Sequence, residues 1–381
     1  MSSPASPADA PIPLLDLRAE WAEIGLEIRA ALDRVFASQQ WILGPGGEAL
    51  EREIAQLCGS PFGVGVASGT DALTLALHAS GVGPGDDVIV PAFTFIATAS
   101  AVSALGARPV FADIEPTSFA LDAARIEERL TPRTRAIVAV HLFGLAAEMD
   151  PILALGGRRE IAVIEDNAQS LGAKYRGRPT GSMGAFGCLS FYPSKNLGAY
   201  GDAGMILTPS AAAAERLRGL RNHGETKRYV SAERGWNSRL DEIQAAVLRV
   251  KLRHLAQWTA ARQAVARAYD AALSGVPGIR PPQGRDGSVH VYSVYTIRVE
   301  GGAARRDRVK QHLAERGIAS VVYYPVPLHL QPLYVGAGLK PGALPQSERA
   351  ADEVLSLPIY PALTEVQIAR VAQAVVGAAR A

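Results

Sequence analysis

The feature that most constrains the fold is a series of short, uniformly apolar segments between residues 62 and 207. Two of them are Val-Ile-Val at 88–90 and Ile-Val-Ala-Val at 137–140. A strand with one face in water alternates apolar and polar residues, and these segments do not, so both faces should be covered. Stretches with helical periodicity separate the segments. The sequence therefore predicts an α/β fold with a mostly parallel sheet flanked by helices.

The expected elements follow from the same periodicity. We expect strands at 62–67, 87–90, 108–112, 136–140, 161–164, 188–191 and 204–207, and two helices before them, over 21–35 and 50–57. After Arg239 a long helix should continue towards Tyr269, followed by a break rich in proline and glycine at 276–284. A strand at 289–299, a helix at 306–316 and a strand at 319–324 should come next. We predict a large domain over residues 12–250, a smaller α+β domain over 251–381, and a disordered tail over 1–11.

Bulk composition excludes several classes of protein. The chain has 381 residues, of which 48% are hydrophobic and 20% charged, and its formal net charge is +2. We therefore expect a globular protein with no nucleic-acid partner. Residues 88–107 carry no charge, but Pro91 and Gly106 interrupt them, so we predict no membrane span. Cys58 and Cys188 lack metal-ligand spacing, which favours a cytoplasmic protein with no metal and no disulfide.

Residues 190–202 form a candidate catalytic loop. Their sequence, Ser-Phe-Tyr-Pro-Ser-Lys-Asn-Leu-Gly-Ala-Tyr-Gly-Asp, lies between two expected strands and contains one lysine, Lys195. Burial would penalise an unpaired ammonium there. One interpretation is a surface loop with a solvated lysine. The other is a Schiff base between Lys195 and pyridoxal phosphate, which removes the charge and uses the nucleophile. The loop alone does not decide between them.

Other strand ends offer groups that this cofactor would need. Gly69 and Thr70 follow the first strand and open a helix, so they would bind a phosphate or merely begin the helix. Asp166 ends the fifth strand and would keep a pyridinium protonated or cap a helix, with Gln169 within reach of the ring hydroxyl. Phe95 would stack on a flat ring or pack in the core. The ligand crevice of an open parallel sheet lies outside these carboxyl ends, so the groups are expected to lie together.

The chain resembles the DegT/StrS family of pyridoxal phosphate-dependent sugar aminotransferases, which have the aspartate aminotransferase fold (fold type I). The resemblance runs from about Pro13 to the C-terminus. It rests on Ser-Gly-Thr at 68–70, Pro-Ala-Phe-Thr-Phe at 91–95, Glu-Asp-Asn-Ala-Gln at 165–169, Ser-Phe-Tyr-Pro-Ser-Lys-Asn-Leu-Gly at 190–198, Gly-Trp-Asn-Ser-Arg-Leu-Asp at 235–241 and Tyr-Tyr-Pro-Val-Pro-Leu-His at 323–329. Asn167 and Ala203 stand where Ala and Gly are more usual, and neither departure removes a functional group.

The resemblance implies a role for each cofactor-binding residue. Lys195 would form the Schiff base, and Asp166 would pair with the pyridine nitrogen. Further contacts would come from Gln169 at the ring oxygen, Phe95 on the ring face, and Gly69, Thr70 and Ser190 at the phosphate. Asn237 would reach the phosphate from the neighbouring subunit, so the resemblance implies a homodimer with shared active sites.

The implied reaction moves an amino group from L-glutamate to a keto-hexose linked to dTDP or UDP. Lys195 would shuttle a proton between the substrate carbon and C4′ of the cofactor, while Asp166 keeps the ring electron-withdrawing. The stretches 190–193 and 237–241 most resemble the branch that acts on 3-keto sugars, so we expect amination at C3. The expected substrate contacts are Tyr192, Arg239, Tyr323, Tyr324 and His329, although the tyrosine pair would equally suit strand packing. A basic mouth for the diphosphate, or else a solvated loop, would comprise Arg221, His223, Lys227, Arg228 and Arg239.

Several alternatives stay open. They are a 4-keto sugar aminotransferase, a pyridoxal phosphate-dependent sugar dehydratase, a non-catalytic regulatory protein on the same fold, and a nicotinamide dehydrogenase. Such dehydratases replace the Schiff-base lysine with histidine, so Lys195 counts against that reading. The complete set of catalytic groups disfavours a regulatory protein. No glycine lies three residues after Gly65, so the dinucleotide fingerprint is absent and a dehydrogenase is disfavoured.

Overall fold

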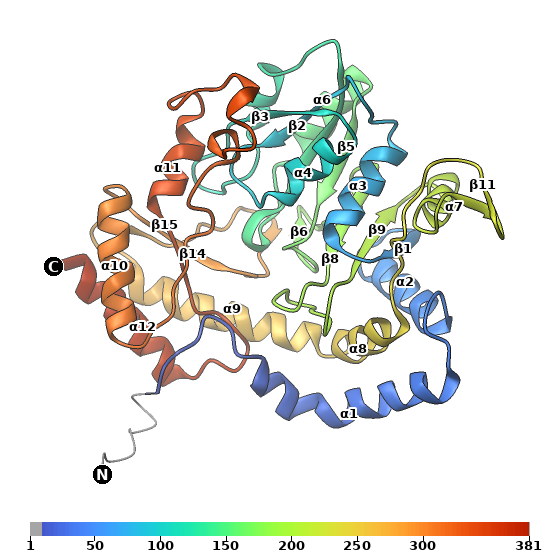
Figure 1. Ribbon diagram of the computed structural model, residues 1–381. Coiled ribbons are helices and arrows are strands. Elements are labelled where there is room, and N and C mark those ends of the chain that lie inside the picture. Colours follow the sequence, from blue (N-terminus) through green and yellow to red (C-terminus); the bar gives the residue numbers. More distant parts are fainter. Residues whose placement is uncertain (1–9, 381) are drawn as a thin grey trace.

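A seven-stranded sheet forms the centre of the molecule, with the strand order β1-β9-β8-β5-β4-β2-β3 (Figure 1). The computed structural model describes residues 10–380, so most of the tail expected at 1–11 lies outside the described residues. The strands are β1 (Phe62–Val66), β2 (Asp87–Pro91), β3 (Arg108–Ala112), β4 (Thr134–Val140), β5 (Ala162–Asp166), β8 (Phe186–Ser190) and β9 (Gly204–Thr208). Only β9 runs against its neighbours in this sheet, β1 and β8. The prediction of a mostly parallel sheet is confirmed.

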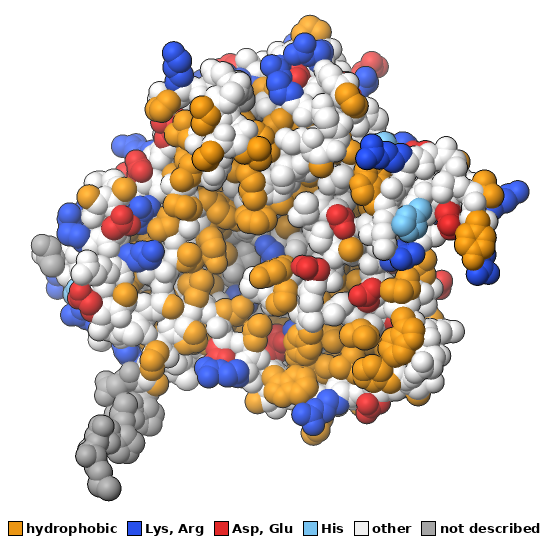
Figure 2. Space-filling model, viewed as in Figure 1, with side chains coloured by type: hydrophobic (Ala, Val, Ile, Leu, Met, Phe, Trp, Pro, Cys, Tyr) orange, Lys and Arg blue, Asp and Glu red, His pale blue; other side chains and the backbone are white. Residues whose placement is uncertain are grey.

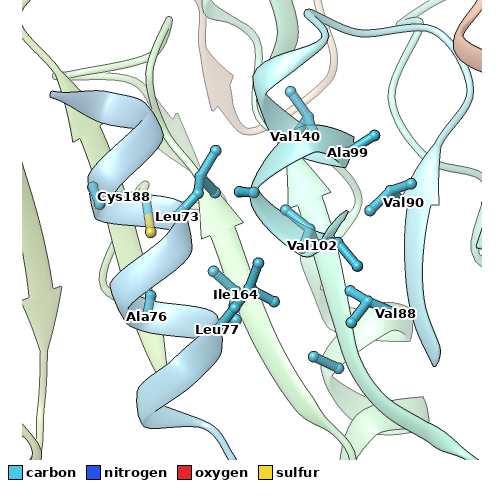
Figure 3. Packing of buried hydrophobic residues seen from close by; sticks show 14 of the residues in the cluster. Leu73, Ala76, Leu77, Val88, Val90, Ala99, Val102, Val140, Ile164 and Cys188 are labelled. Atoms are coloured by element: carbon cyan, nitrogen blue, oxygen red, sulfur yellow. The ribbon is translucent and has the colours of Figure 1, made fainter. Parts of the chain in front are cut away.

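Helices cover both faces of this sheet, as its apolar strands require. On one face α3 (Gly69–Ala79) and α4 (Ala97–Ala104) pack their small and branched side chains onto β2, β4, β5 and β8 (Figure 3). On the other face α6 (Met149–Arg159) packs on β4 and β5. The helices α1 (Leu17–Ser38), α2 (Pro45–Leu57) and α8 (Glu242–Leu252) lie together beside the sheet, and α7 (Ala211–Leu220) packs on β1 and β9. The two helices expected near the N-terminus are present.

A second core surrounds a three-stranded antiparallel sheet in the C-terminal part. Its strands, in the order β12-β14-β15, are β12 (Ile279–Arg280), β14 (Tyr295–Val299) and β15 (Val354–Leu357). The helices α9 (Leu255–Leu273), α10 (Ala303–Glu315) and α12 (Glu365–Arg380) enclose this core, and α11 (Pro345–Glu353) lies between the two parts. Ile12 is buried in the second core, where its N–H donates to Gly317 O at 2.8 Å. The N-terminal segment therefore packs against residues more than 300 positions later in the chain.

The C-terminal part differs from the expectations in three places. The strand expected at 289–299 is two short strands, because Ser288–Val289 (β13) pairs with Lys174–Tyr175 (β6) of the large part and only β14 joins the small sheet. The strand expected at 319–324 is reduced to one bridge, between Val321 and Ser356. The long helix expected after Arg239 is divided at residues 253–254, where the N–H of His254 bonds to Lys251 O. The boundary near residue 250 stays a proposal, and it falls at the end of α8.

Three further short strands lie outside the two sheets described above. Arg178–Pro179 (β7) pairs with β6, and Glu225–Lys227 (β10) with Val230–Ser231 (β11) forms a hairpin that projects from the body of the protein (Figure 1). Cys58 and Cys188 are buried and unpaired. Within residues 10–380, no helix combines the length and apolar character needed to cross a membrane.

Candidate active site

The carboxyl ends of the parallel strands open into a cavity of about 470 Å³. Figure 2 shows a hollow near the centre of one face of the molecule, with Lys or Arg atoms inside it. The cavity is lined from the main sheet by Ser68, Gly69, Thr70, Thr94, Phe95, Val140, Asp166, Gln169, Ser190 and Lys195. Its opposite wall comes from the N-terminal segment and the C-terminal part of the chain, through Leu14, Leu15, Arg262, Tyr323, Tyr324, Leu357 and Ile359. The sheet thus brings together the residues that the strand ends predicted.

The loop that contains Lys195 is packed, not solvated. Phe191, Leu197 and Ala199 are buried against α2 and α8. The backbone N–H of Lys195 donates to Tyr192 O at 2.8 Å, which fixes a turn at the tip of the loop. Burial lowers the pKa of the Lys195 ammonium, and the charge of Asp166 opposes that shift. A lysine with a lowered pKa on a fixed loop is suited to act as a nucleophile and a base.

Asp166 faces the cavity from the end of β5. Its Oδ2 accepts a hydrogen bond from Thr98 Oγ1 at 2.8 Å, and its Oδ1 accepts one from the N–H of Ala168 at 3.2 Å. Burial raises the pKa of the carboxyl, while the Thr98 bond and the charge of Lys195 act in the other direction. A cation placed beside Asp166 would favour the ionised form. The carboxylate therefore suits a protonated pyridine nitrogen.

Glu165 points to the other side of the sheet, as strand alternation predicts. It accepts hydrogen bonds from the N–H groups of Gly181 and Gly184, both at 2.7 Å, and lies 2.9 Å from His141 Nε2. The other ring nitrogen of His141 accepts from the N–H of Ala147 at 3.0 Å. His141 is thus a buried histidine with both ring nitrogens satisfied, and it does not line the cavity.

The start of α3 forms a cradle suited to a phosphate. Ser68 caps the helix, because its Oγ accepts a hydrogen bond from the N–H of Asp71 at 3.1 Å. The following residue packs directly on the end of β8: a Cβ added at Gly69 would lie 2.6 Å from Cβ of Ser190, so only glycine fits. The first N–H groups of a helix have no partner within it, and its dipole favours an anion. Gly69, Thr70 and Ser190 therefore fit a phosphate at this place.

Aromatic and amide side chains line the side of the cavity between Asp166 and the C-terminal part of the chain. Gln169 Nε2 donates to Tyr324 Oη at 3.1 Å, and Gln169 Oε1 accepts from the N–H of Phe143 at 2.8 Å. The ring of Phe95 is 53% exposed and its centroid lies 6.1 Å from that of Tyr324. Tyr192, also exposed, and Tyr323 line the same cavity. A flat ring bound above Asp166 would have Phe95 available on one face.

Three predicted substrate or subunit contacts lie outside this cavity. His329 is fully buried, its Nε2 lies 3.1 Å from Glu348 Oε1, and it does not line the cavity, so its contact with substrate stays a prediction. Arg239 donates to Asn222 Oδ1 at 3.0 Å and, like the exposed Asn237, does not line the cavity of its own chain. The motif at 323–329 gave no sign that His329 pairs with Glu348, nineteen residues later in the chain.

The basic mouth is smaller than expected. Arg221 is buried and pairs with Glu51 at 2.5 Å, so it is not available to a ligand. His223, Lys227 and Arg228 are exposed around the β10–β11 hairpin.

Two residues of the site were missed from the sequence. Thr98 lies one helical turn after Thr94 in an uncharged segment, where a hydroxyl gives no signal of its own. Arg262 left a clearer sign, because it interrupts an apolar helix face four residues after Trp258 and three before Val265. All three side chains are buried. Arginine is seldom buried without a partner, so an arginine on the apolar face of an amphipathic helix indicates a specific role.

The residues present fit pyridoxal phosphate. A lysine with lowered pKa, a buried carboxylate, an aromatic face and a helix N-terminus line one cavity, and each matches one part of that cofactor. Within residues 10–380 no group of three or more His, Cys, Asp or Glu side chains is arranged to hold a metal ion.

The chain is similar over most of its length to proteins of one known family. A model of the DegT/DnrJ/EryC1/StrS aminotransferase family matches residues 22–376. A dTDP-3-amino-3,4,6-trideoxy-alpha-D-glucose transaminase of Streptomyces venezuelae is 46% identical over 372 residues, 97% of each chain. A UDP-N-acetyl-3-dehydro-alpha-D-glucosamine 3-aminotransferase of Acidithiobacillus ferrooxidans is 48% identical over 361 residues, 95% of this chain and 96% of that one. A pleiotropic regulatory protein of Geobacillus stearothermophilus is 46% identical over 358 residues, 93% and 95%.

Solved structures give the same result. DesV of S. venezuelae, in complex with a ketimine intermediate, superimposes with a TM-score of 0.94 at 46% identity, over 98% of this chain and 99% of that one. NtdA from Bacillus subtilis, with bound cofactor PMP, has a TM-score of 0.89 at 30% identity, over 98% and 86%.

Proposed function

The chain belongs to the DegT/DnrJ/EryC1/StrS aminotransferase family, and on that premise we propose that it transfers an amino group from L-glutamate to the C3 keto group of a hexose linked to dTDP or UDP. It is a pyridoxal phosphate-dependent aminotransferase. The choice of C3 is supported by two relatives at 46% and 48% identity whose names specify a 3-amino or 3-dehydro sugar. The observation on which the proposal depends is the cavity that joins Lys195, Asp166 and the start of α3.

When bound, the cofactor supplies an aldehyde that accepts the amino group and a ring that withdraws electrons. Lys195 Nζ would move a proton between the substrate carbon and C4′ of the cofactor, and burial assists because it lowers the pKa of the ammonium. Asp166 would hold the proton on the ring nitrogen, with Thr98 fixing the orientation of its carboxylate. The first helical residues of α3, with Ser190, would bind the phosphate.

The sugar would lie between the cofactor and the small domain. Tyr192, Tyr323 and Tyr324 line that side, and their hydroxyls are suitable donors for a hexose. Tyr324 already accepts a hydrogen bond from Gln169, so it would link the sugar pocket to the ring oxygen of the cofactor. Lys227 and Arg228, both exposed on the projecting hairpin, are candidate cations for the diphosphate of a neighbouring subunit's substrate.

A homodimer with shared active sites completes the proposal. Asn237 is exposed and does not line the cavity of its own chain. From this position it would not contact a cofactor bound in that cavity. Large apolar side chains are exposed on and after α1, among them Leu26 at 83% and Phe36 at 50%. Figure 2 shows hydrophobic side chains gathered over the region of α1 and α8. A second copy of the chain would cover this surface and bring Asn237 to the partner's phosphate. Two buried, unpaired cysteines are compatible with a reducing, cytoplasmic setting.

A regulatory role is the second candidate, because one relative at 46% identity is named a pleiotropic regulatory protein. A sugar dehydratase is less favoured, since this chain retains Lys195.

Matched 3-keto and 4-keto sugar nucleotides test the proposal. The enzyme is first converted to its amine form with L-glutamate, and the return of the aldehyde absorbance is then followed with each sugar. We expect faster return with the 3-keto compound. Faster return with the 4-keto compound would overturn the choice of carbon, and no return with any keto sugar would favour the regulatory role.

A further inference from the structure

Among residues 10–380, Arg262 is the one charged residue that lines the cavity from the C-terminal part of the chain. It lies on α9, its side chain faces the same cavity as Lys195 and Asp166, and the residue is only 4% exposed. Leu14, Leu15, Leu357 and Ile359 of the same wall are aliphatic, and its other polar groups are the hydroxyls of Ser293, Tyr323 and Tyr324. A guanidinium placed among aliphatic side chains has lost most of its hydration and requires a compensating partner.

The protein itself does not supply an acidic partner. Arg262 Nη1 donates to Ile359 O at 2.8 Å, and in residues 10–380 no carboxylate oxygen lies within 4.0 Å of the guanidinium. The other two buried arginines differ in this respect, since Arg221 pairs with Glu51 and Arg306 with Asp307. Glu20 acts on Arg262 only from a distance and is paired with Lys251.

Electrostatics agree with the geometry. Burial lowers the pKa of Arg262 to about 10, so the group stays protonated at neutral pH but carries a poorly solvated charge. A planar guanidinium with free N–H groups matches a carboxylate in two parallel hydrogen bonds. One guanidinium offers a single pair of parallel N–H donors, which matches the two oxygens of one carboxylate. A diphosphate has more oxygens and needs more donors than this wall provides.

We propose that Arg262 binds a carboxylate of the amino-acid donor and so selects an amino acid, not an uncharged amine, as the source of nitrogen. This inference depends on the proposed aminotransferase function, because the donor enters the cavity where Lys195 acts. Arg262 would be a substrate-binding residue of the first half-reaction only. The sugar nucleotide, which replaces the donor in the second half-reaction, need not use it.

Half-reactions on the holoenzyme separate the two substrates. With Arg262→Gln we expect the L-glutamate concentration for half-maximal loss of aldehyde absorbance to rise on the order of 30-fold or more, as when one partner of a buried charge pair is removed. Arg262→Lys should recover part of this affinity. The second half-reaction, starting from enzyme loaded with pyridoxamine phosphate, should change less than about threefold with the keto sugar nucleotide.

Binding of a carboxylate to Arg262 can also be measured without turnover, through the melting temperature of the holoenzyme. Glutarate has the carboxylates of the donor but no amino group, and it should raise the melting temperature of the wild-type holoenzyme by mass action. It should not do so for Arg262→Gln. The matched control is Arg306→Gln, a buried arginine that also donates to a backbone carbonyl, Ala351 O at 2.7 Å, but does not line the cavity. Its response to glutarate should equal that of the wild type.

Specific outcomes would overturn the inference. Equal glutarate binding by wild type and a folded Arg262→Gln variant would do so, as would a loss confined to the sugar half-reaction, which would assign Arg262 to the diphosphate. If the wild type loses no aldehyde absorbance with L-glutamate yet binds glutarate through Arg262, the carboxylate site stands and the proposed donor fails.

Discussion

Burial lowers the pKa of Lys195 and raises that of Asp166, so it disfavours the charged form of each, and the charge of each residue opposes the shift of the other. The amine is therefore available as a base at a lower pH than a free lysine, and the carboxylate is stabilised once a cation lies beside it. Both residues were predicted from strand-end motifs, because the carboxyl ends of parallel strands must meet. Arg262 was not predicted, because it reaches the cavity only through the packing of α9 against the rest of the protein.

Asp166→Asn tests the electronic role at this scale. The substitution keeps the shape and the contact with Thr98 but removes the charge that holds the ring proton. We expect kcat to fall roughly a thousandfold or more, with the cofactor still bound, because the stabilisation is lost in the transition state. Absorbance titration of cofactor binding and steady-state turnover measure the two effects separately. Turnover close to wild type would mean that Asp166 has only the local role of accepting from Ala168.

At the scale of elements, α8 fixes the loop that contains Lys195. Lys251 is 1% exposed, donates to Gly198 O at 2.6 Å, pairs with Glu20 at 2.5 Å and lies 4.3 Å from the centre of the Tyr200 ring. Gln244, on the same helix, accepts from the N–H of Tyr200 at 2.9 Å. Two polar side chains of α8, Gln244 and Lys251, which lie about two helical turns apart, thus hold the catalytic loop.

Lys251→Met should weaken this support. It leaves Glu20 and Gly198 O without their partner in a buried place, so we expect a loss of about 3–5 kcal/mol in the free energy of unfolding. Turnover should fall as the position of Lys195 becomes less defined. Arg249→Met is the matched control on the same helix, because the exposed pair of Arg249 with Glu53 should contribute at most about 1 kcal/mol. Urea unfolding of both variants measures the difference, and equal losses would show that the loop does not depend on Lys251.

The accuracy of the predicted elements also has a physical basis. Each end of every strand in the main sheet was predicted to within two residues. The reason is that a strand covered by helices on both faces is apolar along its whole length. The break at residues 253–254 was missed, since Val250 and Trp258 continue one apolar face across it. The segment 319–324 has a strand-like sequence but only one bridge, at Val321, and no local pattern reports the lack of a second partner.

For the whole molecule, the proposed homodimer with shared active sites leads to a complementation test. Lys195→Ala and Asn237→Ala should each be inactive as homodimers. Mixed dimers should recover about one competent site, because an isologous interface places one intact set of residues in one of the two cavities. The measurement is turnover after co-refolding or co-expression, with formation of mixed dimers checked by two tags. Absence of recovery in folded mixed dimers would mean that Asn237 does not act across the interface.

The roles proposed for the residues, the catalytic loop and the dimer all depend on one claim, that the cofactor binds covalently to Lys195. Purified protein should be yellow, and reduction with borohydride should fix the cofactor covalently to the peptide that contains Lys195, as peptide mapping would reveal. Lys174 and Lys227 are exposed and provide an internal comparison within the same digest. Label found on Lys195 alone is the predicted result, and label found on Lys174 or Lys227 in its place would contradict it.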